Sequence, residues 1–245
     1  MRNTPLSRPI SVEDWRLKVT YSRVKIVDSF DELVSTAFGP EVNALCWARN
    51  LPGNFDEVAA RFSDDEIISL DEETLRALTL GADGRVAANA MLADRRLLED
   101  RGLQPSLEWV PRYLRDATST VPTDVYSFHA DRAPVEAYTY LCSYNTAATE
   151  GLRNDQAQRI MDIDSTRTEI LRLYAEDGAG DFDAYVKENC FDLHYRPLPG
   201  ATPFSFGIGN LWRIAVEYPG SPVPPCLHRA PETADGQPPR LLLIS

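Results

Sequence analysis

The stretch from Tyr138 to Tyr144 constrains the fold more than any other part of the chain. Tyrosine or cysteine stands at every second position, and smaller or aliphatic residues stand between them. Successive side chains of a strand point to opposite faces, so this alternation predicts a strand with one aromatic face. Burying that face requires a second sheet opposite it, which the helix-rich first half of the chain would not supply. We therefore expect a β-rich core around this strand.

Other β-forming segments lie on both sides of it. Residues 124–145 are rich in Val, Tyr, Phe and Thr, and strand patterns return at 204–208, 211–218 and 240–245. Between them, 165–176 and 181–188 have helical character and are separated by Gly178 and Gly180. We therefore expect strands on both sides of a helical insert.

The first half of the chain has mostly helical patterns. Residues 41–49 are an exception, since this apolar run between Gly-Pro and Pro-Gly pairs predicts a strand. Capping and apolar spacing predict four helices. They run from Asn54 to Ala60, from Asp71 toward Gly81, from Ala87 to Glu99, and from Ser106 with Leu107, Val110 and Leu114 on one face.

Composition excludes several classes of protein. The 245 residues carry a net charge of −12, which disfavours nucleic acid or a membrane surface as a partner. The N-terminus lacks the apolar core of a signal peptide, and no apolar run is long enough to span a bilayer. The four cysteines are far apart and form no Cys-x-x-Cys pair. We expect a cytoplasmic protein; the sequence does not indicate its oligomeric state.

The chemistry-bearing residues include two of the three histidines. His129 and Asp131 form a His-x-Asp motif on a predicted strand, where residues i and i+2 share a face. His228 precedes another strand, and Arg240 opens the last one. Two imidazoles and one carboxylate can occupy one face of an octahedral metal ion and leave the opposite face open. We therefore predict that His129, Asp131 and His228 bind one divalent metal.

The ordered set His129-x-Asp131, His228 and Arg240 resembles the Fe(II)/2-oxoglutarate-dependent oxygenases. That family implies a double-stranded β-helix, or jelly roll, here within an α+β chain. We accordingly expect one domain over 1–245, with 1–121 a mostly helical support and 122–245 the jelly-roll core, interrupted by the helical insert at about 160–190. The blocks Phe128-His129-x-Asp131 and His228-Arg229-x-Pro231 also resemble an uncharacterised bacterial family, which implies no activity.

The resemblance assigns a role to each residue. His129, Asp131 and His228 would be the catalytic Fe(II) ligands, and Arg240 would pair with the distal carboxylate of the cosubstrate 2-oxoglutarate. Tyr138 and Tyr140 lie on the strand that often gives this family a cosubstrate-binding tyrosine. Arg229, directly after His228, competes with Arg240 for the anchoring role.

Simpler interpretations exist for several of these residues. The tyrosine stripe is also what a hydrophobic core needs, and Arg240 could be a solvated cation at a strand edge. We interpret His194, at the end of the helical insert, as structural. Cys226 lies two residues before His228 but lacks the second ligand pair of a zinc site, so we interpret it as a small buried residue.

The function implied is that of a dioxygenase acting on a small molecule. Because Asp131 fills the carboxylate position, hydroxylation or desaturation is expected rather than halogenation, which needs a vacant ligand position. The main alternative is a jelly roll that holds zinc or iron in an accessory or regulatory role and needs no 2-oxoglutarate. A cupin-like hydrolase or isomerase is a third possibility, although it usually uses more histidines.

Overall fold

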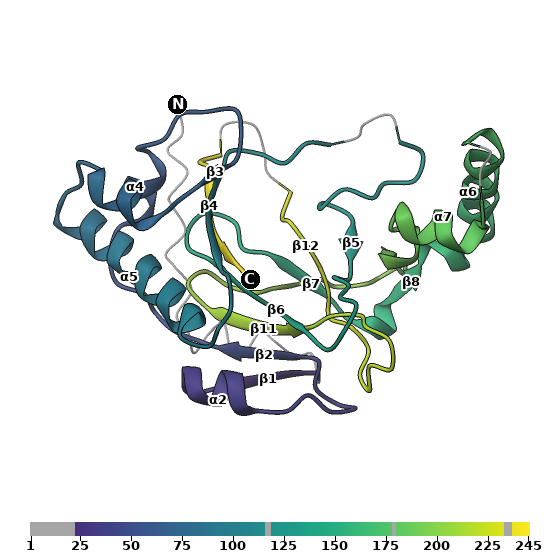
Figure 1. Ribbon diagram of the computed structural model, residues 1–245, viewed down its shortest axis with the longest axis horizontal. Helices are drawn as coiled ribbons and strands as arrows, with labels where there is room; N and C mark the ends of the chain where they lie inside the picture. Colours follow the sequence, from purple (N-terminus) through teal and green to yellow (C-terminus); the bar gives the residue numbers. More distant parts are fainter. Residues whose placement is uncertain (1–22, 116–118, 178–179, 233–236) are drawn as a thin grey trace.

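A computed structural model describes residues 23–115, 119–177, 180–232 and 237–245. These residues form an α+β fold built on two curled β-sheets (Figure 1). The large sheet is antiparallel except for the pair β1 and β2. Its strands, in spatial order, are β1 (Val24–Val27), β2 (Ala44–Trp47), β11 (Leu211–Ala215), β6 (Tyr138–Ser143), β13 (Arg240–Ile244), β4 (Ser106–Val110) and β3 (Ile68–Ser69).

The small sheet is antiparallel throughout. In spatial order its strands are β10 (Phe204–Ser205), β7 (Glu150–Leu152), β12 (Leu227–Arg229), β5 (Phe128–His129), β9 (His194–Pro197) and β8 (Ala157–Arg159). Each sheet has an inner face, which is turned toward the other sheet, and an outer face, which is turned away from it.

Four antiparallel pairs link the two halves of the chain in a nested order. The outermost pair in sequence is β4 with β13, and inside it come β5 with β12, β6 with β11 and β7 with β10. Alternate pairs belong to alternate sheets, so the first and third lie in the large sheet and the second and fourth in the small sheet.

Helices cover the outer face of the large sheet, and in Figure 1 α4 and α5 lie on the opposite side of the strands from α6 and α7. The expectation that a second sheet covers the tyrosine-bearing face of β6 is wrong. Helices of the first half bury this face, because Tyr140, Cys142 and Tyr144 belong to one cluster with residues of α3 and α5. The helices are α2 (Phe30–Ser35), α3 (Phe55–Ala59), α4 (Glu72–Ala77), α5 (Ala82–Glu99), α6 (Asp164–Asp177) and α7 (Phe182–Glu188), with 3₁₀ turns η1 (Asn154–Gln156), η2 (Ile160–Asp162) and η3 (Phe191–Leu193).

Several predicted elements are confirmed. Asn54 and Asp71 cap α3 and α4 with their side chains, as their positions indicate. The insert is helical, with α6 and α7 on either side of the predicted break; Gly180 has a positive φ of 96°, and Gly178 lies outside the described residues. The short segments 41–49, 204–208 and 211–218 contain β2, β10 and β11.

The predicted helix opening at Ser106 is wrong. Residues Ser106–Val110 form strand β4, which pairs along its whole length with β13. Leu107 and Trp109 alternate into the core, whereas Leu114 is 88% exposed and lies beyond the strand. The apolar spacing fits both structures, and the long-range partner strand decides between them.

The first half of the chain therefore supplies four strands of the large sheet in addition to its helices. None of the helices within the described ranges is both long and apolar enough to cross a bilayer.

Candidate metal centre

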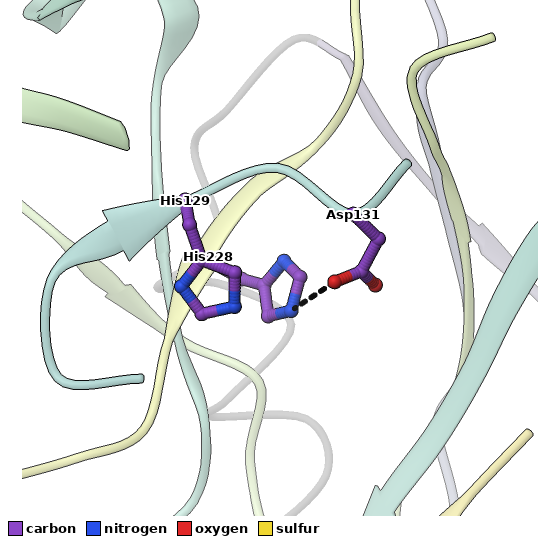
Figure 2. Close-up of side chains that lie close together, drawn as sticks. All are labelled: His129, Asp131 and His228. Carbon is purple, nitrogen blue, oxygen red and sulfur yellow. Dashed lines mark ion pairs between the residues drawn. The ribbon is translucent and has the colours of Figure 1, made fainter. Parts of the chain in front are cut away.

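Three potential metal ligands converge on the inner face of the small sheet (Figure 2). His129 and His228 are direct partners in the register of β5 and β12, and their ring centroids are 4.6 Å apart. Asp131 follows β5 on the same face, and its Oδ1 lies 3.7 Å from Nε2 of His228. The register of β5 with β12 therefore brings His228 next to the His129-x-Asp131 motif.

Each imidazole is oriented by a backbone carbonyl two residues before it. Nδ1 of His129 lies 2.8 Å from the Ser127 oxygen, and Nδ1 of His228 lies 3.3 Å from the Cys226 oxygen. Because a carbonyl can only accept, Nδ1 carries the proton in both contacts. This leaves the Nε2 lone pair of each ring free to bind a metal.

The carboxylate of Asp131 is held from the opposite sheet. Thr139 on β6 donates from its hydroxyl to Oδ2 over 2.5 Å, and the Asp131 carbonyl accepts from the Glu217 amide over 2.7 Å. Oδ1 remains on the side of His228. The second carboxylate oxygen is thus anchored, and the first is left for a metal.

The protonation states match those of metal ligands. Burial, followed by the neighbouring His228, lowers the pKa of His129 to about 4, so its ring is neutral at pH 7. Burial opposes ionisation of Asp131, but His228 and the Thr139 hydroxyl outweigh it and hold the pKa of this carboxyl below its ordinary value. A neutral imidazole and a carboxylate are the forms that bind a divalent cation.

The spacing of the donors fits a metal ion. One donor atom from each residue can be chosen so that all three lie within 4.8 Å of one another. On one face of an octahedral ion the three ligand atoms lie roughly 3 Å apart, because each bond is roughly 2.0–2.2 Å long and the ligands are at right angles to one another. Side-chain rotations that bring the donors closer together would complete a three-ligand site of two imidazoles and one carboxylate.

Arg240 lies on the inner face of the large sheet and is 3% exposed. Its guanidinium donates to the Ala147 carbonyl and to the hydroxyls of Ser143 and Thr149, over 3.2–3.3 Å. Within the described residues no carboxylate pairs with it. Burial lowers the pKa of Arg240, which means that its charge is incompletely compensated. Such a cation is suited to receive an anion.

Arg229 has a different environment. It follows His228 on a strand and so points to the opposite face, where Nε donates to Glu150 over 2.8 Å and the guanidinium lies 4.5 Å above the Phe128 ring. Because Arg229 already has a carboxylate partner, Arg240 is the better candidate for an anion anchor.

Tyr138 and Tyr140 do not join the site, contrary to their predicted cosubstrate-binding role. Thr139 and Ser143 face inward on β6, so alternation turns the two tyrosines to the outer face. Tyr140 is buried there under the helices, and the Tyr138 hydroxyl donates to Glu136. The core interpretation of the stripe is the one that the structure supports.

Sequence reasoning missed His194 as a neighbour of the site. In the register of β5 and β9, His194 is the direct partner of His129, and the ring centroids lie 5.6 Å apart. His228, His129 and His194 thus form a row across three adjacent strands. The pairing of β9 with β5 leaves no local sequence signal.

Cys226 is buried, which raises the pKa of its thiol, and it is not one of the three clustered donors.

No protein-family model matches the chain, and no curated protein matches it.

Proposed function

We propose that the protein is an Fe(II)/2-oxoglutarate-dependent oxygenase that hydroxylates or desaturates a small molecule. The observation that carries this proposal is the combination of a two-histidine, one-carboxylate cluster with a buried arginine that has no acidic partner in the described residues. A metal site alone would not require such a cation, whereas a dicarboxylate cosubstrate does.

The strand pairing supports a jelly-roll core. If β4, β5, β6, β7, β10, β11, β12 and β13 are numbered one to eight, strand one pairs with eight, two with seven, three with six and four with five. This is the pairing of an antiparallel ribbon wound into two sheets. On this numbering His129 ends strand two, His228 lies on strand seven, and Arg240 opens strand eight.

The position of β6 relates the two parts of the site. Thr139 contacts Asp131, and Ser143 contacts Arg240, from the same inner face of this strand. Thr139 and Ser143 are four residues apart on this strand, so their Cα atoms are separated by roughly 13 Å. The long side chain of Arg240 shortens the distance between its guanidinium and the metal cluster. A dicarboxylate with one end at the metal and the other at the guanidinium fits this arrangement.

In this proposal the residues of the site have separate roles. His129, Asp131 and His228 hold the Fe(II) and leave positions open opposite them. Arg240, with the hydroxyls of Ser143 and Thr149, binds and orients the distal carboxylate. Bound iron supplies the oxidative chemistry with 2-oxoglutarate and oxygen. Asp131 occupies the ligand position that a halogenase leaves vacant, which favours hydroxylation or desaturation.

Anaerobic addition of 2-oxoglutarate to the Fe(II)-loaded protein tests the proposal. Chelation of the cosubstrate should produce a weak visible charge-transfer band that neither component gives alone. If Fe(II) binds stoichiometrically but no band forms, the oxygenase proposal fails. A metal-binding jelly roll with a zinc or iron accessory role would then account for the cluster.

A further inference from the structure

His194 is a buried polar side chain without a role in the proposed ligand set. It is 5% exposed, and its Nδ1 has no hydrogen-bond partner among the described residues. A buried, unpaired polar atom costs free energy, so it indicates a group that arrives later. His194 opens β9, which follows the helical insert and lies between β5 and the edge strand β8 in the small sheet.

The position of His194 relative to the metal ligands is defined by the strand order. In the order β12, β5, β9, His228 lies on one side of His129 and His194 on the other. Asp131 is placed beside His228, with 3.7 Å between the two side chains. The three clustered donors therefore come from β12, from β5 and from the second residue after β5, and none comes from β9.

The side chain of His194 shares a face with that of His129. Ala130 donates to the Leu193 carbonyl over 3.0 Å, so these neighbours form the hydrogen-bonded pair and His129 and His194 form the closer, non-hydrogen-bonded pair. Both rings extend into the space between the sheets. A molecule bound on the β9 side of the metal would meet His194 first.

We propose that His194 donates a hydrogen bond to the metal-proximal carboxylate of a 2-oxo acid bound at this centre. The inference rests on the proposed function and extends it, because it assigns the two ends of the cosubstrate to different parts of the fold. Arg240 on the large sheet binds the distal carboxylate, and His194 on β9 of the small sheet binds the end at the metal.

The binding of two small molecules, 2-oxoglutarate and oxalate, distinguishes the role of His194 from that of Arg240. 2-Oxoglutarate has both ends, whereas oxalate can chelate the metal but has no distal carboxylate for Arg240. Calorimetry would measure both on anaerobic Fe(II)-loaded wild type, His194→Phe, His194→Asn and Arg240→Ala. His194→Phe keeps the ring shape without the nitrogens, and His194→Asn restores a polar group close to the position of Nδ1. His194→Leu replaces His194→Phe if the latter fails to bind stoichiometric Fe(II).

The expected result is that His194→Phe weakens both ligands by the same factor, about 10- to 100-fold, the range for a hydrogen bond to a charged group. His194→Asn should recover most of the affinity, and Arg240→Ala should weaken 2-oxoglutarate alone. Tyr195→Phe, on the opposite face of β9, is the matched control and should bind both ligands as the wild type does.

Three results would overturn this proposal or its premise. If His194→Phe binds both ligands like the wild type, His194 makes no such contact, although the oxygenase proposal stands. If it weakens 2-oxoglutarate but not oxalate, His194 acts on the distal end and the assignment is wrong. If wild-type Fe(II) protein binds no 2-oxoglutarate, the proposed function itself fails.

Discussion

Nε2 of His228 lies 3.7 Å from Oδ1 of Asp131, although the two residues come from distant parts of the chain. The contact joins β12 to the segment that comes after β5, and the pairing of His228 with His129 fixes the register between these two strands. A one-residue slip would turn His228 to the outer face and remove it from the site. The candidate metal centre therefore depends on the register of the small sheet.

Removing any one ligand should abolish stoichiometric Fe(II) binding. His129→Ala, Asp131→Ala and His228→Ala each leave two donors, and a three-ligand site has no spare. Elemental analysis of anaerobically loaded protein measures this directly. His194→Ala is the control and should retain the metal, because His194 is not among the three clustered donors. Full iron occupancy in the His228→Ala protein would mean that the distal ligand is misassigned.

The Thr139 hydroxyl should matter for metal affinity although it is no ligand. It holds Oδ2 of Asp131 from the opposite sheet, over 2.5 Å. Loss of such an outer contact typically lowers metal affinity about 10- to 100-fold. We expect this loss in Thr139→Val, measured by competition with a chelator, and near wild-type affinity in Thr139→Ser. Equal affinities in Thr139→Val and wild type would show that Asp131 is positioned without this contact.

Local sequence signals are sufficient for part of the fold. Alternation on β6 predicts its strand and its buried aromatic face, and the capping residues Asn54 and Asp71 mark helix starts because capping is a local interaction. The strand β4 has the local pattern of a helix, since its identity depends on pairing with β13 at the far end of the chain. Propensity yields to such long-range pairing.

Local sequence signals likewise predict only part of the candidate site. His129-x-Asp131 is a local motif, and the order of His228 and Arg240 after it is visible in sequence. Which arginine lacks a carboxylate partner among the described residues is not visible in the sequence, because Glu150 reaches Arg229 only through the pairing of β7 with β12. His194 likewise joins the row of histidines through the register of β9, which no local pattern predicts.

Acidification should destabilise the metal-free protein through its buried histidines. Burial lowers the pKa of both His129 and His194 to about 4, against about 6.5 in an unfolded chain. Between these values the unfolded state binds more protons, so the stabilising contribution is complete above about pH 6.5 and declines toward pH 4. Urea midpoints from pH 7 to 4.5 should fall, and less steeply in His194→Phe. Equal slopes in the two proteins would contradict this origin of the pH dependence.

A buried ion pair attaches α5 to the large sheet. Arg49 makes two bonds of 2.6 Å to the Asp94 carboxylate, which also accepts from the Tyr144 hydroxyl over 2.9 Å. Asp94→Ala leaves a buried guanidinium unpaired and should lower the free energy of unfolding by about 3–5 kcal/mol. Glu99→Ala breaks the more exposed Arg95–Glu99 pair on the same helix and should cost at most about 0.5 kcal/mol. If chemical denaturation gives similar losses of unfolding free energy in both variants, the buried pair stabilises the protein no more than the exposed pair does.

Calorimetric titration of 2-oxoglutarate into anaerobic Fe(II)-loaded wild type and Arg240→Ala tests the oxygenase account most directly. Arg240→Ala should keep its iron but bind 2-oxoglutarate about 30- to 1000-fold more weakly, or about 2–4 kcal/mol, because it lacks the distal anchor. Arg240→Lys should recover only part of the loss, since an ammonium lacks the guanidinium fork. Arg229→Ala should bind the cosubstrate like the wild type. Wild-type protein that holds Fe(II) yet binds no 2-oxoglutarate at millimolar concentration would contradict the account.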